Sequence, residues 1–185
     1  MSEKALYNVQ PLRTQEEIDD LKWSLERYCG RRDHFLFVFG INTGLRVSDL
    51  LPLKVADVRD RTHVVIIEKK TGKKKRFPIM ALQSEIVHYT AGMRSDEYLF
   101  ASRKGNGPIT TTQAYRALVK AASMIDRDDI GTHTMRKTFG YHYYKRTKDI
   151  VTLMEIFNHS APSITKRYIG ITQDEIDQSL KDFLL

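Results

Sequence analysis

Residues 62–79 read THVVIIEKKTGKKKRFPI, and their pattern differs from that of the chain on either side. The β-branched run His63–Ile67 is typical of a strand, and Arg76–Ile79 resumes extended character. The intervening Thr71-Gly72 is a turn signal. These residues therefore predict a small β-hairpin.

The segments before the hairpin favour helices. Thr14 followed three residues later by Glu17 is a capping box, which predicts a helix that begins after Thr14. The almost wholly apolar run His34–Ile41 stops at Asn42-Thr43-Gly44, and this pattern predicts a buried helix with a glycine terminator. A sharp turn and a short helix, Val47–Leu51, are expected to follow.

Helical patterns return after the hairpin. The expected helices are Leu82–Ala91, Thr111–Met124, Thr134–Arg146, Asp149–Phe157 and Thr172–Phe183. Thr172 with Glu175 forms a second capping box at the start of the last helix, and Ser102–Pro108 is expected to be a loop. The sequence thus predicts an α+β fold that is mainly α, with a small antiparallel sheet.

The composition predicts one domain with an anionic partner. The 185 residues with 41% hydrophobic content are enough for one ordinary core, so residues 1–185 are expected to form a single domain. Lys and Arg number 30 against 23 Asp and Glu, which gives a formal charge of +7. Such a charge favours nucleic acid, acidic lipid or acidic protein without choosing between them.

Neither a disulfide nor a zinc site is expected. Cys29 is the single cysteine, so it cannot form an intrachain disulfide, and no Cys/His cluster has zinc-ligand spacing. The N-terminal residues lack the apolar region of a signal peptide, and no apolar run approaches the ~18 residues of a membrane span. The sequence predicts a soluble, cytoplasmic protein without a membrane partner.

Five places carry polar or basic residues that packing alone does not explain: Arg46, the run from Lys69 to Arg76, His133 with Arg136, His159, and Tyr168. Each also has an ordinary interpretation. Arg46 can pair with Asp49, three residues further along a short helix. His133 and Arg136 lie on one helix face, which can be a solvated surface or can grip an anion. Tyr168 can be a core tyrosine with its hydroxyl bonded.

The basic run flanks the hairpin turn, so several ammonium groups are expected to project from one tip. Its members are Lys69, Lys70, Lys73, Lys74, Lys75 and Arg76. A charge run is usually a solvated surface. A basic β-hairpin is also well shaped to reach a groove or a phosphate strand, and the residues alone leave both interpretations open.

The order and spacing of these residues resemble the tyrosine recombinase, or phage integrase, family. The resemblance covers about residues 12–185, nearly the whole chain. Its motifs are Thr43-Gly44-Leu45-Arg46-Val47-Ser48-Asp49-Leu50-Leu51, Lys70-Thr71-Gly72, His133-Thr134-Met135-Arg136, and Asn158-His159 with Arg167-Tyr168. Asn158 departs from the family's usual glycine. Because Asn also tolerates a left-handed backbone, His159 is still expected to point inward.

The resemblance implies a site-specific DNA recombinase or integrase that works through a 3′-phosphotyrosyl intermediate. Tyr168 would attack the scissile phosphate and release a 5′-hydroxyl, a transesterification that needs no metal, nucleotide or other cofactor. Arg46 and Arg136 would stabilise the charge on the nonbridging oxygens. His159 would add a further hydrogen bond.

The same resemblance assigns the proton transfers. His133 would act as base or positioning group for the tyrosine, and Lys70 would protonate the departing 5′-oxygen. Asp49 would support the site by orienting it. Contacts with DNA are expected from the other basic residues of the hairpin, which are Lys69, Lys73, Lys74, Lys75 and Arg76.

Family members act on double-stranded DNA, and the resemblance implies a homo-oligomer, a cyclic tetramer on paired DNA sites. The family usually carries a separate N-terminal DNA-binding domain, and this chain begins too late to include it. Two other interpretations stay open. A type IB topoisomerase shares the tyrosine chemistry but reseals the same strand, and a noncatalytic DNA-binding module would retain the fold alone. A bacterial, phage or mobile-element origin is expected.

Overall fold

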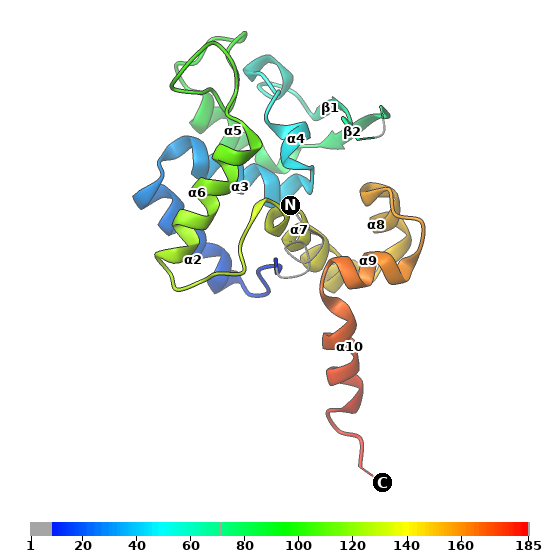
Figure 1. The fold of residues 1–185 in the computed structure, drawn as a ribbon. Coiled ribbons are helices and arrows are strands. Elements are labelled where there is room, and N and C mark those ends of the chain that lie inside the picture. Colours follow the sequence, from blue (N-terminus) through cyan, green and yellow to red (C-terminus); the bar gives the residue numbers. More distant parts are fainter. Residues whose placement is uncertain (1–8, 71, 185) are drawn as a thin grey trace.

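The structure, a computed structural model, describes residues 9–70 and 72–184 (Figure 1). Its larger body is built from helices α2 (Gln15–Tyr28), α3 (Arg31–Thr43), α4 (Val47–Leu50), α5 (Gln83–Thr90), α6 (Thr111–Ser123) and α7 (Thr132–Thr147). Two short 3-10 turns, Val55–Asp57 and Met80–Leu82, connect the hairpin to this body. Helix α3 contacts α2, α5, α6 and α7, so it is the centre of the body.

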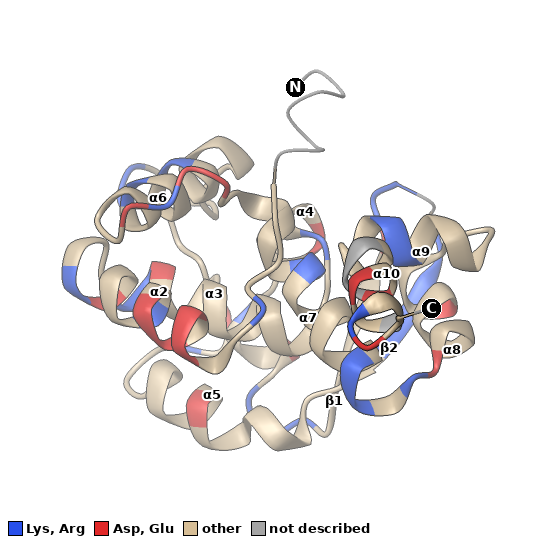
Figure 2. Cartoon of the chain, turned by 90° about the horizontal axis from the view of Figure 1, so that it is seen from below, with Lys and Arg blue, Asp and Glu red and all other residues tan. Residues whose placement is uncertain are grey.

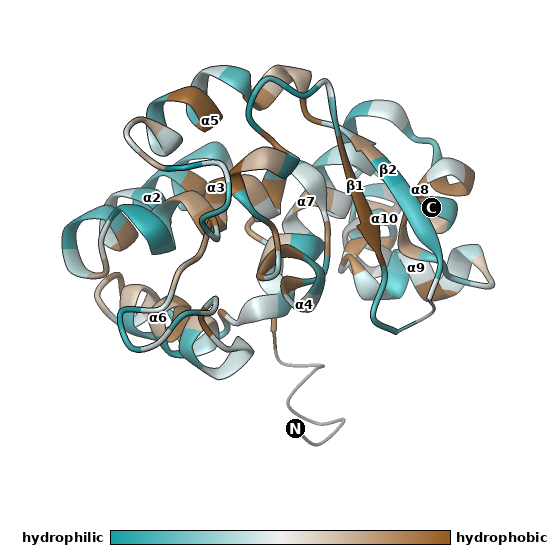
Figure 3. Cartoon of the chain, turned by 90° about the horizontal axis from the view of Figure 1, so that it is seen from above, coloured by the Kyte–Doolittle hydropathy of each residue, from teal (hydrophilic) through white to brown (hydrophobic). Residues whose placement is uncertain are grey.

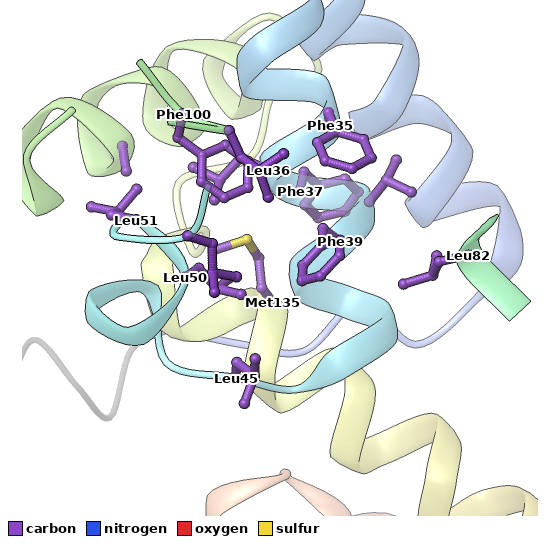
Figure 4. Close-up of a cluster of buried hydrophobic side chains, with 14 of the residues drawn as sticks. Phe35, Leu36, Phe37, Phe39, Leu45, Leu50, Leu51, Leu82, Phe100 and Met135 are labelled. Atoms are coloured by element: carbon purple, nitrogen blue, oxygen red, sulfur yellow. The ribbon is translucent and has the colours of Figure 1, made fainter. Parts of the chain in front are cut away.

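Helix α3 is central because its residues are apolar on nearly every side. Phe35, Leu36, Phe37 and Phe39 are all buried, and Figure 4 shows them at the middle of the main hydrophobic core. Met135 of α7 joins this core and packs against Gly40, where a Cβ would collide with the methionine side chain. The first turns of α7 are thereby fixed against α3.

A second, smaller core lies where α7 meets α8 (Ile150–Phe157) and α9 (Pro162–Tyr168). Its buried members are Tyr141, Tyr144, Leu153, Phe157, Ile169 and Ile171. Gly140 allows the close approach, since a Cβ there would collide with Ile169 and Phe157. Helix α7 therefore belongs to both cores and holds α8 and α9 against the larger body.

Strands β1 (His63–Ile67) and β2 (Lys74–Pro78) form the predicted antiparallel hairpin. Ile66 lies opposite Lys75 in the register. One face of the hairpin is buried, whereas Val65 and Ile67 on the other face are exposed. Figure 3 shows the contrast between the apolar β1 and the hydrophilic β2. The turn residue Thr71 lies outside the described residues.

Several local predictions are confirmed. The capping box forms, with Glu17 N donating to Thr14 Oγ1 at 3.1 Å and Thr14 N donating to Glu17 Oε2 at 3.0 Å. Gly44 ends α3 with a φ of 63°, the left-handed conformation expected of a glycine terminator. The segment 102–108 is a loop.

The predicted second capping box is wrong. Helix α10 (Ile171–Leu180) begins directly after Gly170, which has a φ of 74°, so Thr172 is inside the helix. The carboxylate of Glu175 instead accepts hydrogen bonds from Tyr144 Oη and Lys166 Nζ, both at 2.7 Å. These contacts fix the base of α10, and the rest of the helix extends away from the body (Figure 1).

Helix α9 was not among the helices expected from the sequence.

None of the described helices combines the length and the apolar character needed to cross a membrane. Across residues 9–70 and 72–184, no three His, Cys, Asp or Glu side chains are grouped so that they could hold a metal ion.

Candidate active site

Tyr168, the last residue of α9, lies beside His133 in the first turn of α7. Its Oη is 3.1 Å from His133 Nδ1. The phenol ring is half-buried and lies edge-on to two neighbours, with ring centroids 5.6 Å from Phe157 and 5.2 Å from His159. Residues from three helices and the α8–α9 connection therefore fix the orientation of the phenol.

The phenol is held in its protonated form. Burial raises the pKa of Tyr168 above the usual value of 10.0, and the charges of Arg136 and Arg46 act in the opposite direction. Nearby positive charge by itself favours the phenolate. Both charges are present, but burial has the larger effect on the pKa. Ionisation of Tyr168 therefore requires a base.

His133 has the properties of such a base. Burial lowers the pKa of His133 below the usual 6.5, and the charges of Lys137, Arg136 and Arg46 lower it further. The imidazole is therefore neutral at neutral pH, and a neutral imidazole has one nitrogen that accepts a proton. Its Nδ1 faces the hydroxyl of Tyr168.

Arg136, one turn further along α7, is buried with 4% of its surface exposed. Its Nη1 donates to Gly44 O at 2.5 Å and its Nη2 to Phe157 O at 3.0 Å. The guanidinium also lies 4.2 Å from the centroid of the Phe157 ring. Burial lowers the pKa of Arg136 to about 10, so the group is still charged at neutral pH.

Arg46 enters the site from the turn before α4. Its Nη1 lies 2.8 Å from Glu68 Oε1, and its Nη2 lies 3.5 Å from Phe157 O. The pair with Asp49 that the sequence allowed does not form. Asp49 Oδ1 instead accepts a hydrogen bond from Lys69 N at 3.0 Å, so the buried Asp49 anchors the start of the hairpin turn.

Both arginines therefore donate to Phe157 O at the carboxyl end of α8, where the last carbonyls of a helix carry partial negative charge. Asn158 ends the helix with a φ of 55°, the left-handed conformation predicted for it. This turn directs His159 inward, and its Nδ1 lies 3.0 Å from Thr165 Oγ1. Burial lowers the pKa of His159 to about 4, with further contributions from the cations Arg136 and Arg46, so this imidazole is neutral at neutral pH.

The basic residues of the hairpin divide into two groups. Lys69, Lys70, Lys73, Lys74 and Arg76 are exposed, as expected for a basic tip. Lys75 differs, because it is half-buried and its Nζ donates to Ile156 O at 2.9 Å. Lys70 is close enough for its charge to help lower the pKa of His159. Figure 2 shows Lys and Arg in blue around α9 and Asp and Glu in red on α2.

Glu68 and Lys137 were not among the predicted site residues, and Lys75 was expected to contact DNA from the exposed tip, whereas the structure places it half-buried. Glu68 and Lys75 lie on the buried face of the hairpin and face Arg46. Lys137 lies with its Nζ 5.5 Å from the ring centroid of Tyr168 and donates to Val9 O at 2.6 Å. The two hairpin residues had a signal in the sequence, since strand alternation places them on the same face as Ile66 and Phe77.

A tyrosine beside a neutral histidine, with two guanidiniums held by backbone carbonyls, can support the chemistry of one class of protein, in which a phenol attacks a phosphate group. Comparison with known proteins agrees with this class. Residues 14–175 match the profile of the phage integrase family. The chain belongs to the phage integrase family, as predicted from the sequence.

The relatives are integrases and tyrosine recombinases. The probable integrase/recombinase YoeC of Bacillus subtilis (strain 168) is 50% identical over 179 residues, which cover 96% of this chain and 98% of that protein. The tyrosine recombinase XerD of Corynebacterium glutamicum is 29% identical over 153 residues, or 78% of this chain. The matched part is 50% of that XerD, so the chain corresponds to about half of this longer relative.

The fold is also that of solved recombinases. The crystal structure of the XerH site-specific recombinase, bound to a palindromic difH substrate in a post-cleavage complex, superposes with a TM-score of 0.67 at 17% sequence identity. The match covers 94% of this chain and 53% of that one. The mainly helical α+β fold with a small antiparallel sheet, expected from the sequence, is confirmed.

Proposed function

We propose that this chain is a site-specific recombinase or integrase that cleaves and rejoins double-stranded DNA, with Tyr168 as the nucleophile. The observation that carries the proposal is the 3.1 Å contact between Tyr168 Oη and His133 Nδ1, next to the charges of Arg136 and Arg46. The structure of the Tn1549 transposon integrase, which shares the fold and is in complex with circular intermediate DNA, supports DNA as the substrate.

In the proposed reaction Tyr168 Oη bonds to phosphorus while the bond between phosphorus and the 5′-oxygen breaks. His133 takes the phenol proton, and Lys70 gives a proton to the departing 5′-oxygen. The nonbridging oxygens gain charge in the transition state, and Arg46 and Arg136 bind them. The 5′-hydroxyl of a second strand then attacks the phosphotyrosyl bond and restores the tyrosine. No bond is hydrolysed, so the reaction is a balanced transesterification.

His159 and Asp49 have supporting roles in this proposal. The neutral His159 donates a hydrogen bond to a nonbridging oxygen from its Nε2, because its Nδ1 is engaged with Thr165. Asp49 holds the backbone of Lys69 and so places the turn that carries Lys70. The exposed Lys69, Lys73, Lys74 and Arg76 contact the DNA backbone.

Exchange between two DNA sites needs several copies of the chain, and we propose a homo-oligomer on paired sites, as the family resemblance implies. Helix α10 supports this assembly, because it extends from the body and exposes apolar side chains (Figure 1). Ile176 and Leu180 on this helix are 45% and 56% exposed, and Phe183 and Leu184 beyond its end are 64% and 94% exposed. Acting on DNA, the protein would work in the cytoplasm of a bacterial cell.

The proposed function is tested on nicked or supercoiled DNA that carries candidate sites, with EDTA present and ATP absent. The expected products are covalent protein–DNA adducts and recombinant joints. Relaxation of supercoils without joints would favour a type IB topoisomerase, and binding without adducts would favour a noncatalytic module. A strict magnesium requirement for cleavage would contradict the mechanism.

The role of His133 predicts how the cleavage rate depends on pH. Only the neutral imidazole accepts the phenol proton, so the rate should fall as the pH is lowered through the pKa of His133. Because burial holds that pKa below 6.5, the loss is expected on the acid side of pH 6.5, and the rate at neutral pH is unaffected. Single-turnover adduct formation between about pH 5 and 8 measures this profile.

His133→Ala provides the control for this profile. The variant should cleave DNA more slowly by a factor of ~10² to 10⁴, and its cleavage rate should no longer fall on the acid side of pH 6.5. If the cleavage rate of His133→Ala falls at acid pH as the wild-type rate does, a group other than His133 causes the pH dependence.

The role of Lys70 is tested with a modified substrate. If Lys70 protonates the 5′-oxygen, Lys70→Ala should cleave ordinary DNA very slowly but should cleave a 5′-bridging phosphorothiolate at nearly the wild-type rate. A thiol has a pKa of ~8.5, so its thiolate leaves without a proton donor. Cleavage rates on the two substrates are compared for each variant.

Lys69→Ala and Lys73→Ala are matched controls, because both lysines belong to the same basic run. Neither variant should show the rescue, which is slow cleavage of ordinary DNA together with nearly wild-type cleavage of the 5′-bridging phosphorothiolate. If one of them shows it and Lys70→Ala does not, the general acid has been assigned to the wrong lysine. If none shows it, the proton comes from another group.

A further inference from the structure

Glu68 is a buried carboxylate at the edge of the candidate site, with 2% of its side chain exposed. The hairpin holds its backbone on both sides, since Glu68 N donates to Lys73 O at 3.0 Å and Gly72 N donates to Glu68 O at 2.8 Å. Burying a carboxylate costs free energy unless cations compensate it. Cations next to Glu68 are therefore needed to compensate its buried charge.

Two cations share one oxygen of this carboxylate. Glu68 Oε1 lies 2.8 Å from Arg46 Nη1 and 3.5 Å from Lys75 Nζ. Lys75 reaches it because strand alternation places its side chain on the same face as the buried Phe77, opposite Ile66. Burial lowers the pKa of Lys75, and the charge of Glu68 opposes this shift, which supports a charged pair.

The same two cations bind the end of α8. Lys75 Nζ donates to Glu155 O at 3.2 Å and to Ile156 O at 2.9 Å. Arg46 Nη2 lies 3.5 Å from Phe157 O. These carbonyls belong to the last helical turn, which attracts cations. The carboxylate and the helix end together hold both cations beside the proposed phosphate position.

We propose that Glu68 is a positioning residue for strand cleavage, which acts by holding Arg46 and Lys75 in place for the scissile phosphate. The inference rests on the proposed function, because it requires Arg46 to bind that phosphate. A carboxylate in this place also repels the phosphate. It therefore weakens DNA binding while it accelerates the chemical step, and these opposite effects distinguish it from a residue that only supports the fold.

The test is Glu68→Gln, which keeps the size of the side chain and removes its charge. A neutral acceptor holds a guanidinium more weakly than a carboxylate does, so single-turnover adduct formation should slow by ~10-fold or more. DNA affinity should be unchanged or tighter. The affinity is measured in the Tyr168→Phe background, where binding is separated from cleavage. Glu85→Gln, at an exposed position on α5, is the matched control.

Two further variants sharpen the test. Glu68→Asp retains the charge and should keep more of the cleavage rate than Glu68→Gln. In a double-mutant cycle, the losses of cleavage rate in Glu68→Gln and Lys75→Met should combine less than multiplicatively, because part of the effect of Glu68 is exerted through Lys75. Fully multiplicative losses would mean that they act independently and would overturn the shared role.

The outcomes separate the inference from the proposed function. Wild-type cleavage by Glu68→Gln overturns the inference, and so does a parallel loss of rate and affinity. If the wild-type chain forms no adduct, the proposed function fails instead. The affinity in the Tyr168→Phe background still decides about Glu68 in that case, since weaker binding of the Gln variant would contradict a phosphate-facing carboxylate.

Discussion

Tyr168→Phe is expected to abolish covalent adducts with DNA while DNA binding is retained. The substitution removes the nucleophilic oxygen and keeps the ring, whose neighbours Phe157 and His159 pack edge-on against it. The variant should therefore fold and bind as the wild-type chain does. Adducts are measured by denaturing gel electrophoresis after incubation with nicked DNA, and affinity is measured on intact DNA in parallel.

Tyr143→Phe is the matched control, because Tyr143 is another half-buried tyrosine, on α7, and its hydroxyl has no part in the proposed reaction. This variant should form adducts at the wild-type rate. Adduct formation by Tyr168→Phe would move the nucleophile to another residue, with Tyr141, Tyr143 and Tyr144 as the nearest alternatives in sequence.

Arg136→Ala should reduce the rate of cleavage by ~10² to 10³-fold, the usual effect of losing one preorganised donor. Arg136→Lys should recover little of this loss, because an ammonium group cannot reproduce the paired hydrogen bonds of a guanidinium. Neither variant should be rescued by the 5′-bridging phosphorothiolate that rescues Lys70→Ala. The nonbridging oxygens that Arg136 is proposed to bind are the same in both substrates.

The stability of the Arg136 variants must be measured together with their cleavage rates, because Arg136 also makes contacts that support the fold. Its loss leaves Gly44 O without the hydrogen bond that it accepts, at a cost of ~1 to 3 kcal/mol for a buried group left unpaired, whereas Phe157 O keeps its contact with Arg46 Nη2. Arg94→Ala, at a side chain that is 72% exposed, serves as the control for loss of an arginine. If the Arg136→Ala variant is folded, binds DNA and cleaves it at the wild-type rate, Arg136 does not have the proposed role of binding the nonbridging oxygens.

The sequence predicted most of the fold because its local signals agree with the tertiary structure. The Thr14 capping box, the Gly44 terminator and the β-branched strand His63–Ile67 are all found where they were expected. Helix α9 was missed because its seven residues are too few for a helical period, although Pro162 at its start is a typical first residue. The helix is placed by the small core under it.

The site was predicted less completely, because its arrangement depends on contacts between distant segments. The family motifs named Arg46, His133, Arg136, His159 and Tyr168, and the structure brings these side chains together. The partner of Arg46 was not predictable from spacing along a helix. Glu68 lies 22 positions away, directly after strand β1, and reaches Arg46 only through the fold, whereas the nearer Asp49 is engaged by the backbone of Lys69.

The identity of the nucleophile is the central claim, and mapping the covalent bond tests it most directly. The wild-type chain is trapped on a nicked suicide substrate in EDTA, the adduct is digested, and the peptide that carries the nucleotide is sequenced by mass spectrometry. The expected result is a nucleotide joined through its 3′-phosphate to Tyr168. A nucleotide on any other residue, or a 5′-phosphate linkage, would contradict the mechanism.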